Sequence, residues 1–166
     1  RAFGSIGLAF ALAGYLAAPS GSPRHAALVW NASASAPIGL YVVAHRRKPA
    51  RGDLVLVDPP PPLAAFAANR GYLPQGVLLV KRIAAVAGDM VCARGNRLFI
   101  SGHFASARLV ADSNGRSLPA WTGCRPLRER EVFLLMANVR TSFDGRYFGP
   151  TDVSQIAGTL RPIWTR

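Results

Sequence analysis

Hydrophobic residues occur along this chain in short runs that are separated by glycine, proline and charged residues. Such runs, bounded by turn-forming residues, are typical of buried β-strands. The pattern predicts strands at Leu40–Val43, Leu54–Val57, Val77–Val86 and Val132–Ala137, one or two strands within Val153–Trp164, and a short helix at Leu63–Asn69. Four prolines, Pro59–Pro62, predict a loop or a sheet edge, because proline cannot donate to a strand ladder. The sequence therefore indicates a mainly β protein.

The segment from Asp89 to Glu131 has a different texture, with closely spaced Gly, Asn and Ser residues and shorter apolar runs. It predicts short strands at Arg97–Ile100 and Arg108–Val110, and so an inserted β lobe at about residues 89–131. Both cysteines, Cys92 and Cys124, fall within this lobe. They fit either one disulfide that ties the ends of the lobe, which requires an oxidising compartment, or two buried thiols.

Residues 2–18 are uncharged and mostly apolar, and Arg1 precedes them. A membrane-spanning helix needs about 20 such residues, with a lower limit near 17. We therefore expect residues 1–24 to form a membrane anchor with a linker, and residues 25–166 to form the domain on the far side of the membrane from Arg1. A cleaved signal peptide and a buried core helix are the alternatives.

The chain is strongly basic, with 20 Lys and Arg residues against 8 acidic residues and a formal net charge of +12. Such a charge suits nucleic acid, an anionic membrane surface or an acidic substrate, or is simply solvated. The basic residues are spread along the chain and do not alternate with aromatic residues, as they do in single-strand binders. We therefore expect no nucleic-acid partner. No Cys/His spacing is typical of zinc, so we also predict no metal and no cofactor.

The stretch Asn31–Tyr41, with the sequence NASASAPIGLY, places a small hydroxyl residue on a stiff segment. Ser35 stands two residues before Pro37, which fixes its own φ and biases the residue before it towards an extended conformation. Gly39 permits a turn that a side chain would obstruct, and the strand from Leu40 follows. This is a suitable position for a nucleophile, although small residues around a proline are more often an ordinary loop.

Two adjacent cations, Lys81 and Arg82, interrupt the apolar run Val77–Val86. Neighbouring residues of a strand face opposite sides, so one of the two points inward. Burial of a lysine disfavours its charged form, and a shift of its pKa to near neutrality costs roughly 4 to 5 kcal/mol at ~1.36 per unit. The alternative is that both cations reach solvent from an edge strand.

The segment Asn138–Pro150 carries Ser142, Asp144 and Arg146 at alternate positions. On an extended segment the three side chains face one side, and the aspartate and arginine form a charge-assisted pair. The alternative is an ordinary surface turn around Asp144-Gly145.

These three stretches together resemble the signal peptidase I superfamily of Ser–Lys peptidases, peptidase family S26. The variant NxSxSxPxGLY with SFDGRYFGP at 142–150 is most similar to the conjugative branch, the TraF-type peptidases that mature the pilin of a conjugation apparatus. Two departures from the signal peptidase pattern fit that branch. Ala36 replaces a methionine, and Met136-Ala137-Asn138 replaces Gly-Asp-Asn.

The resemblance implies a role for each matching residue. It makes Ser35 the nucleophile and Lys81 the general base, gives the Ser33 hydroxyl and the Ser35 N–H to the oxyanion, lets Ser142 orient the lysine, and uses Asp144 and Arg146 to brace the turn. It also implies a signal-peptidase-like β core with an inserted β lobe and an N-terminal membrane helix. The three histidines fall in loop-like contexts, so a Ser-His-Asp triad is not expected: His25, His45 and His103.

We therefore expect a serine peptidase of the bacterial inner membrane, with its catalytic domain in the periplasm. Its substrate would be a translocated pilin or preprotein, processed through an acyl-enzyme. This acyl-enzyme would be resolved either by water or, as the resemblance to the pilin-maturing branch implies, by an amine of the same substrate, which cyclises it. The expected partners are this substrate, the membrane, and components of a conjugation or type IV secretion apparatus. The alternatives are a housekeeping signal peptidase, a basic β module that binds membrane or nucleic acid without catalysis, and a structural part of a secretion apparatus.

Overall fold

The computed structural model describes residues 27–45 and 48–166. The expected anchor at residues 2–18, and His25, lie outside these residues. Along the chain the elements are β1 (Leu28–Asn31), β2 (Gly39–Ala44), β3 (Leu54–Val57), α1 (Pro61–Asn69), β4 (Leu79–Ala85), β5 (Met90–Arg94), β6 (Arg97–Ile100), β7 (His103–Ala107), β8 (Gly123–Pro126), β9 (Glu131–Leu134), α2 (Gly145–Phe148), β10 (Thr151–Asp152), a 3-10 turn (Val153–Gln155) and β11 (Ile156–Thr165). In the described part of the chain, neither helix has the length and apolar character needed to cross a bilayer. The mainly β prediction is confirmed.

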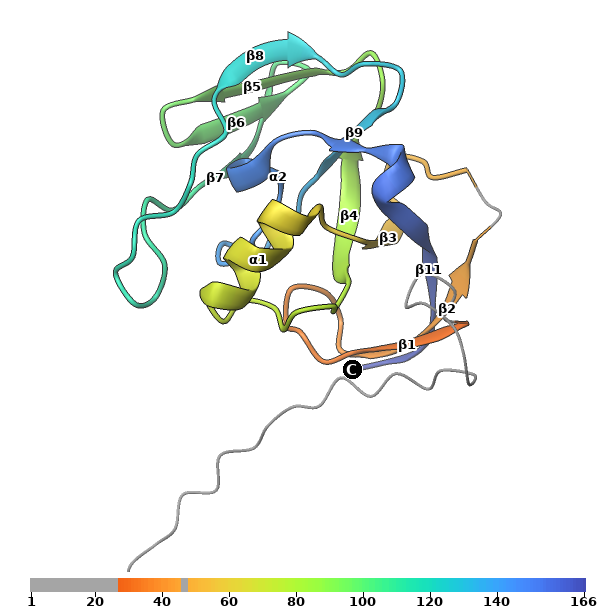
Figure 1. The fold of residues 1–166 in the computed structure, drawn as a ribbon. Helices are drawn as coiled ribbons and strands as arrows, with labels where there is room; N and C mark the ends of the chain where they lie inside the picture. Colours follow the sequence, from red (N-terminus) through yellow and green to blue (C-terminus); the bar gives the residue numbers. More distant parts are fainter. Residues whose placement is uncertain (1–26, 46–47) are drawn as a thin grey trace, which may run out of the picture.

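The larger sheet has seven strands in the order β1-β2-β11-β3-β4-β9-β10, and every neighbouring pair is antiparallel. The C-terminal strand β11 is inserted between β2 and β3, so it joins the N-terminal hairpin to the rest of the sheet (Figure 1). All four residues of β3 are buried, as its continuous apolar run predicts for a central strand.

Gly39 is needed because β11 runs very close to it. A Cβ at this position would collide with the Trp164 carbonyl oxygen and lie 2.8 Å from the Thr165 Cα. The sequence pointed to this glycine through a turn, whereas the structure shows that the approach of a neighbouring strand requires it.

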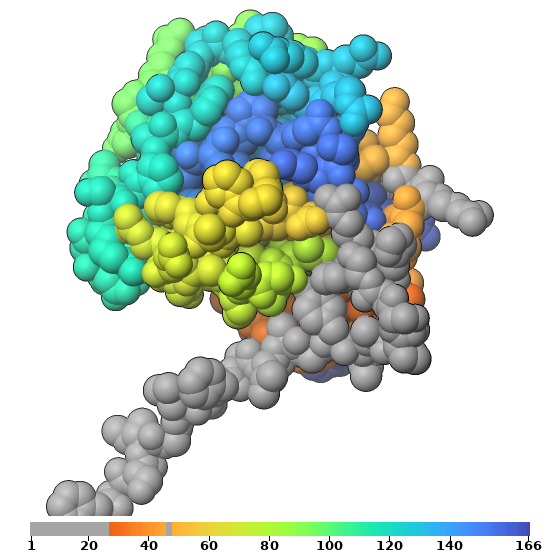
Figure 2. Space-filling view, viewed as in Figure 1, coloured from red at the N-terminus to blue at the C-terminus, as the bar shows by residue number. Residues whose placement is uncertain are grey.

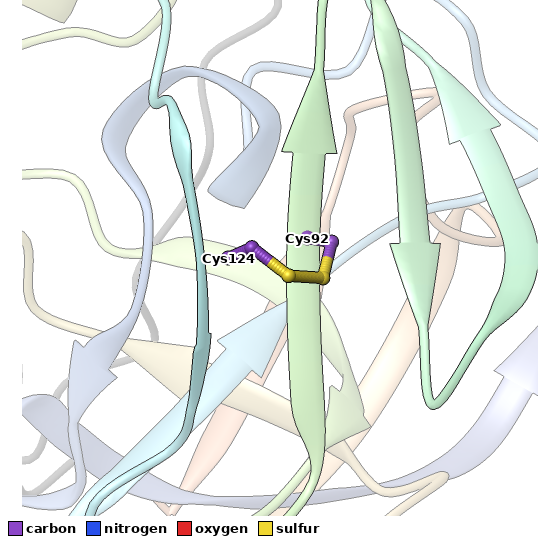
Figure 3. The surroundings of a disulfide bond; sticks show 2 residues. All are labelled: Cys92 and Cys124. Carbon is purple, nitrogen blue, oxygen red and sulfur yellow. A yellow bond between two sulfur atoms is a disulfide. The ribbon is translucent and has the colours of Figure 1, made fainter.

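The segment between β4 and β9 folds into a second sheet of four strands, in the order β7-β6-β5-β8. This sheet lies above the larger one in Figure 1. Cys92 of β5 and Cys124 of β8 are directly paired across the ladder and are joined by a disulfide (Figure 3). A buried cluster that includes Val91, Phe133 and Leu135 packs the two sheets together.

Four expectations about local structure are wrong. Pro61 and Pro62 lie in the first turn of α1, not in a loop or sheet edge, because proline is tolerated where a helix N–H has no partner. Arg108–Val110 is not a strand, because the Leu109 N–H donates to the Tyr147 hydroxyl at 3.2 Å instead of to a neighbouring strand. The strand expected to start at Val132 ends at Leu134.

The fourth wrong expectation is the extended conformation of Asn138–Pro150. The Ser142 N–H donates to the Val139 carbonyl in a turn, and Asp144 caps the short helix α2 by accepting from the Arg146 N–H. A capping side chain satisfies an otherwise unpaired helix N–H, so this aspartate favours a helix start over a strand. A turn followed by a capped helix therefore brings the three polar residues together.

Candidate active site

Ser35 lies on the loop between β1 and β2, and this loop is held at both ends. The buried Asn31 side chain donates to the carbonyl oxygens of Ser33, Ala36 and Pro37 at 2.9, 3.1 and 3.0 Å. The buried Tyr41 hydroxyl donates to the Pro37 carbonyl at 2.6 Å. The serine is therefore partly exposed on a loop whose backbone is fixed by buried side chains.

A second hydroxyl lies directly beside Ser35. The Oγ atoms of Ser33 and Ser35 are 2.7 Å apart, and the Ser35 N–H donates to the Ser33 Oγ at 3.2 Å. The structure thus brings together the hydroxyl and the N–H that the family resemblance assigns to an oxyanion.

Lys81 of β4 reaches this loop from inside the protein. Its side chain is buried, with 4% exposure, and its Nζ donates to the Ser35 Oγ at 3.4 Å and to the Ser142 Oγ at 3.2 Å. Arg82 is exposed and donates to the Gly52 carbonyl on the other face of the strand. The expectation that one of these two cations points inward is confirmed. In Figure 1 the β1–β2 loop lies beside the lower end of β4.

Burial lowers the pKa of the Lys81 amine from its ordinary 10.5 to about 8. The loss of hydration disfavours the ammonium and outweighs the carboxylate of Asp144, which raises the pKa, while Arg146 adds to the lowering. A lysine with this pKa is partly neutral near physiological pH and is able to accept a proton.

Three buried polar residues support the lysine: Ser142, Asp144 and Arg146 are at most 3% exposed. The Asp144 carboxylate accepts from the Arg146 Nε at 2.8 Å and from the Met136 N–H at 3.0 Å. The expected charge-assisted pair is therefore present, within the protein core. Arg146 also donates to the carbonyl oxygens of Val139 and Ser142, so it fixes the turn that carries the Ser142 hydroxyl.

Arg146 extends this network to the second sheet, which the sequence did not predict. Its Nη1 donates to the Ser106 Oγ and to the Ala107 carbonyl of β7, each at 3.2 Å. The buried guanidinium therefore bonds both the turn that carries Ser142 and the second sheet.

A cleft of about 770 Å³ opens beside Ser35 and Lys81. It is lined mainly by apolar side chains, including Val29, Leu73, Val77, Leu79 and Phe143. Its remaining wall comes from the connection that follows β7, which is bonded to the turn after α1. The two segments lie side by side in Figure 2, in teal and yellow. An apolar cleft of this size beside a few converging polar groups is typical of a substrate site.

One carboxylate, Asp112, links the two segments that form this wall of the cleft, and the sequence did not predict its role. Asp112 accepts from the Tyr72 hydroxyl at 2.6 Å and from the Arg116 Nε at 2.8 Å. The Tyr72 hydroxyl bond is the largest of the contacts that hold the pKa of this carboxyl below its usual range.

The sequence also did not predict the roles of Asn31 and Tyr41, since a single asparagine or tyrosine at a strand end carries no distinctive pattern.

The described histidines lie away from Ser35 and bond to backbone carbonyls. The Nδ1 atoms of His45 and His103 are 2.9 and 3.0 Å from the carbonyl oxygens of Ala157 and Ser101. Among residues 27–45 and 48–166, no group of three or more His, Cys, Asp or Glu residues is placed to hold a metal ion.

Comparison with known proteins gives the family. The sequence profile of the family described as signal peptidase, peptidase S26, matches residues 1–165. A plasmid transfer protein TraF of Escherichia coli is 34% identical over 146 residues, which cover 81% of each chain. A conjugal transfer protein TraF of Agrobacterium fabrum is 36% identical over 147 residues, again 81% of each chain. A crystal structure of a signal peptidase I from Enterococcus faecalis aligns with a TM-score of 0.41 and 22% identity, over 69% of this chain and 98% of that one. The profile match and the two relatives show that this chain belongs to the signal peptidase family, peptidase S26.

Proposed function

We propose that the protein is a serine endopeptidase in which Ser35 is the nucleophile and Lys81 is its general base. The observation that carries this proposal is the 3.4 Å contact between the Lys81 Nζ and the Ser35 Oγ, made by a buried lysine. Contacts of this kind are often long in a substrate-free enzyme and shorten when the substrate binds. A serine hydroxyl is a weak nucleophile until a base takes its proton, and only a neutral lysine is able to do so.

Acylation then proceeds in two steps. The neutral Lys81 amine takes the Ser35 proton while the Oγ bonds to the carbonyl carbon of the substrate, whose oxygen gains the negative charge. When that oxygen re-forms its double bond, the C–N bond breaks and the leaving amine takes the proton from the Lys81 ammonium. The product is an ester between Ser35 and the N-terminal part of the substrate.

The negative oxygen is bound by the Ser35 N–H and the Ser33 hydroxyl. Without substrate the Ser35 N–H donates to the Ser33 Oγ at 3.2 Å. The Ser35 N–H must therefore give up this contact when it donates to the oxyanion, whereas the Ser33 Oγ is the acceptor in it and donates through its own hydrogen. Donors of this kind stabilise the negative charge that develops in the transition state, and the loss of one typically lowers kcat by roughly 10²-fold.

We assign the substrate to translocated pilin-like precursors in conjugative transfer. Relatives named plasmid transfer and conjugal transfer proteins support this role. The acyl-enzyme is resolved either by water, which hydrolyses the ester, or by an amine of the same substrate, which cyclises it. The nearest alternative is removal of signal peptides by hydrolysis alone.

We also place the protein at the inner membrane, with the cleft in the periplasm. The uncharged apolar stretch at residues 2–18 supports this location. A membrane-anchored enzyme meets precursors that are themselves held in the membrane after translocation.

The test is the processing of a membrane-anchored pilin-like precursor by wild type, Ser35→Ala and Lys81→Met, with mass analysis of the product. We expect wild type to process the precursor and both variants to be inactive while folded. Arg82→Met is the matched control, because it removes the neighbouring cation on the exposed face of the same strand. A hydrolysed product is heavier than a cyclised one by one water. Full activity in either Ser35→Ala or Lys81→Met would exclude the dyad.

A further inference from the structure

Asn31 is the last residue of β1, and its side chain points into the loop that carries Ser35. This side chain is 4% exposed, and its amide group hydrogen-bonds to that loop. Its Nδ2 donates to the carbonyl oxygens of Ser33, Ala36 and Pro37, and its Oδ1 accepts from the Ser33 N–H at 3.2 Å. The bonded groups lie before and after Ser35, so one side chain fixes the loop on both sides of the serine.

We propose that Asn31 is a positioning residue of the peptidase, which holds the loop at residues 33–37 so that the Ser35 hydroxyl faces Lys81. This inference rests on the proposed function. The hydrogen bonds of the Asn31 amide go to backbone groups of the loop and not to Lys81, so it acts through the backbone of the loop.

The topology explains why such a residue is needed. Ser35 follows β1 and Lys81 lies on β4, and the strands β2, β11 and β3 separate β1 from β4 in the sheet. Strand pairing therefore does not set the distance between the two side chains directly. The Nζ to Oγ distance of 3.4 Å is already at the long end of the hydrogen-bond range, so a small displacement of the loop removes the contact.

The chemistry of the contact requires asparagine. The amide has donors for the carbonyl oxygens and an acceptor for the Ser33 N–H in one short side chain. Aspartate keeps the size and the acceptor but faces the same carbonyl oxygens with a negative charge and no donor. Alanine lacks both. The buried Ala36 carbonyl then loses the amide donor, while the Ser33 and Pro37 carbonyls keep only the Ala36 N–H and the Tyr41 hydroxyl.

The experiment compares full-length wild type, Asn31→Ala, Asn31→Asp and Ser35→Ala on the same peptide substrate, with kcat and KM measured separately. Asn96→Ala and Asn96→Asp, in the exposed turn between β5 and β6, are the matched controls. We expect both Asn31 variants to lose about 10²-fold in kcat, since a misplacement of about 1 Å costs this much, with KM and the folded fraction nearly unchanged. The Asn96 variants should behave as wild type.

Hydrogen exchange of the backbone amides provides a readout that does not depend on turnover. The Ser35 N–H donates to the Ser33 Oγ and the Ala36 N–H donates to the Ser33 carbonyl. In the Asn31 variants these two amides should exchange at least ten times faster than in wild type, while the amides of β3 and β4 keep their rates.

The outcomes separate the two proposals. If Ser35→Ala keeps full activity, the proposed function fails, and the exchange rates alone decide whether Asn31 orders the loop. If Ser35→Ala is inactive but the Asn31 variants keep kcat within twofold, the positioning role is wrong. A loss of kcat that only follows the loss of folded protein would also overturn it, because the residue would then stabilise the fold without placing the serine.

Discussion

Lys81 is the buried amine of the cleft, and its burial disfavours the charged form. Its amine is buried among apolar strands, with two serine hydroxyls as hydrogen-bond partners. The nearby Asp144 favours the ammonium, but that carboxylate is already bonded to Arg146. The net effect is a base that is neutral just above physiological pH, which is the property the proposed chemistry needs.

The activity should therefore rise with pH through the Lys81 pKa of about 8. Only the neutral amine accepts the Ser35 proton, so kcat/KM should fall about tenfold for each unit below that pKa. At pH ~7 roughly one tenth of the amines are neutral. The measurement is kcat/KM of wild type and Arg82→Met across this range, and the two profiles should coincide. A midpoint near ~6.5, the ordinary pKa of histidine, would point to a different base.

The same shift predicts that Lys81 destabilises the folded protein. The folded pKa of about 8 lies below the unfolded value of 10.5. Between these two pH values the unfolded chain holds a proton that the folded chain has lost, so wild-type stability should rise with pH there. Below pH 8 the full penalty of about 3 kcal/mol applies, at ~1.36 kcal/mol per unit.

Lys81→Met removes this penalty. The variant should be inactive but more stable than wild type at neutral pH by up to about 3 kcal/mol, less about 1 kcal/mol for the lost bond to the Ser142 Oγ. The gain should shrink as the pH approaches 10.5. Urea unfolding of both proteins at pH ~7 and ~10 measures it. An equal difference at the two pH values would show that the lysine is not strained by burial.

At the scale of elements, α2 is the shorter of the two α-helices in the described part of the chain, and it carries a residue of the network that supports Lys81. It has four residues, and it places Arg146 in the core. Gly145 opens the helix, and a Cβ there would lie 2.7 Å from the Leu134 carbonyl oxygen and 2.8 Å from the Phe133 ring. The helix therefore packs against β9 at a distance that only glycine allows.

Gly145→Ala should push α2 away from β9 and move the groups that hold the Ser142 turn. We expect a loss of stability of about 1 to 3 kcal/mol, typical of overpacking, together with a loss of kcat in the folded fraction. Urea unfolding and kinetics on the same samples test this. Gly95→Ala is the control, because its Cβ meets nothing within 4 Å and its positive φ costs stability far from the site. Retained kcat in Gly145→Ala would separate α2 from catalysis.

The sequence predicted strands well where an apolar run was long enough to distinguish a strand from a loop. β3 and β6 have the predicted bounds, and the inward lysine of β4 follows from alternation. β1 was missed because its four residues alternate too briefly to be distinctive, and Asn31 was missed with it. α2 was missed because a capped turn of four residues has no helical period.

At the scale of the whole molecule, the site joins residues that no local pattern connects. Ser35, Lys81 and Ser142 are separated by 46 and 61 positions along the chain. The sheet order, with β11 between β2 and β3, places the loop, the strand and the turn that carry them at one cleft. The pattern of hydrophobic residues does not predict the order of strands in the sheet. From the sequence, these residues could be assigned to one site only through the resemblance to a family.

The same sheet order creates an exposed apolar surface at the end of the molecule where the described chain begins. The Trp30 and Trp164 rings stack with centroids 5.9 Å apart, and they are 36% and 51% exposed. Trp30 lies on β1 and Trp164 on β11, and Val42 of β2 and Ile163 of β11 are exposed as well. The C-terminus lies beside β1 in Figure 1. A patch of this kind marks an interaction surface, and its place directly after residue 26 suits the proposed membrane location.

We therefore expect the Trp30–Trp164 pair to lie at the lipid interface in anionic vesicles. Lipids with brominated acyl chains should quench the emission of Trp121→Phe, which keeps only this pair of the three tryptophans. The double variant Trp30→Phe with Trp164→Phe keeps only Trp121, which packs between the two sheets, and its emission should not be quenched. Tryptophan suits an interface because its ring is apolar and its N–H is polar. Equal quenching of both variants, or none in Trp121→Phe, would show that this surface faces water, and the exposed rings would then need a protein partner.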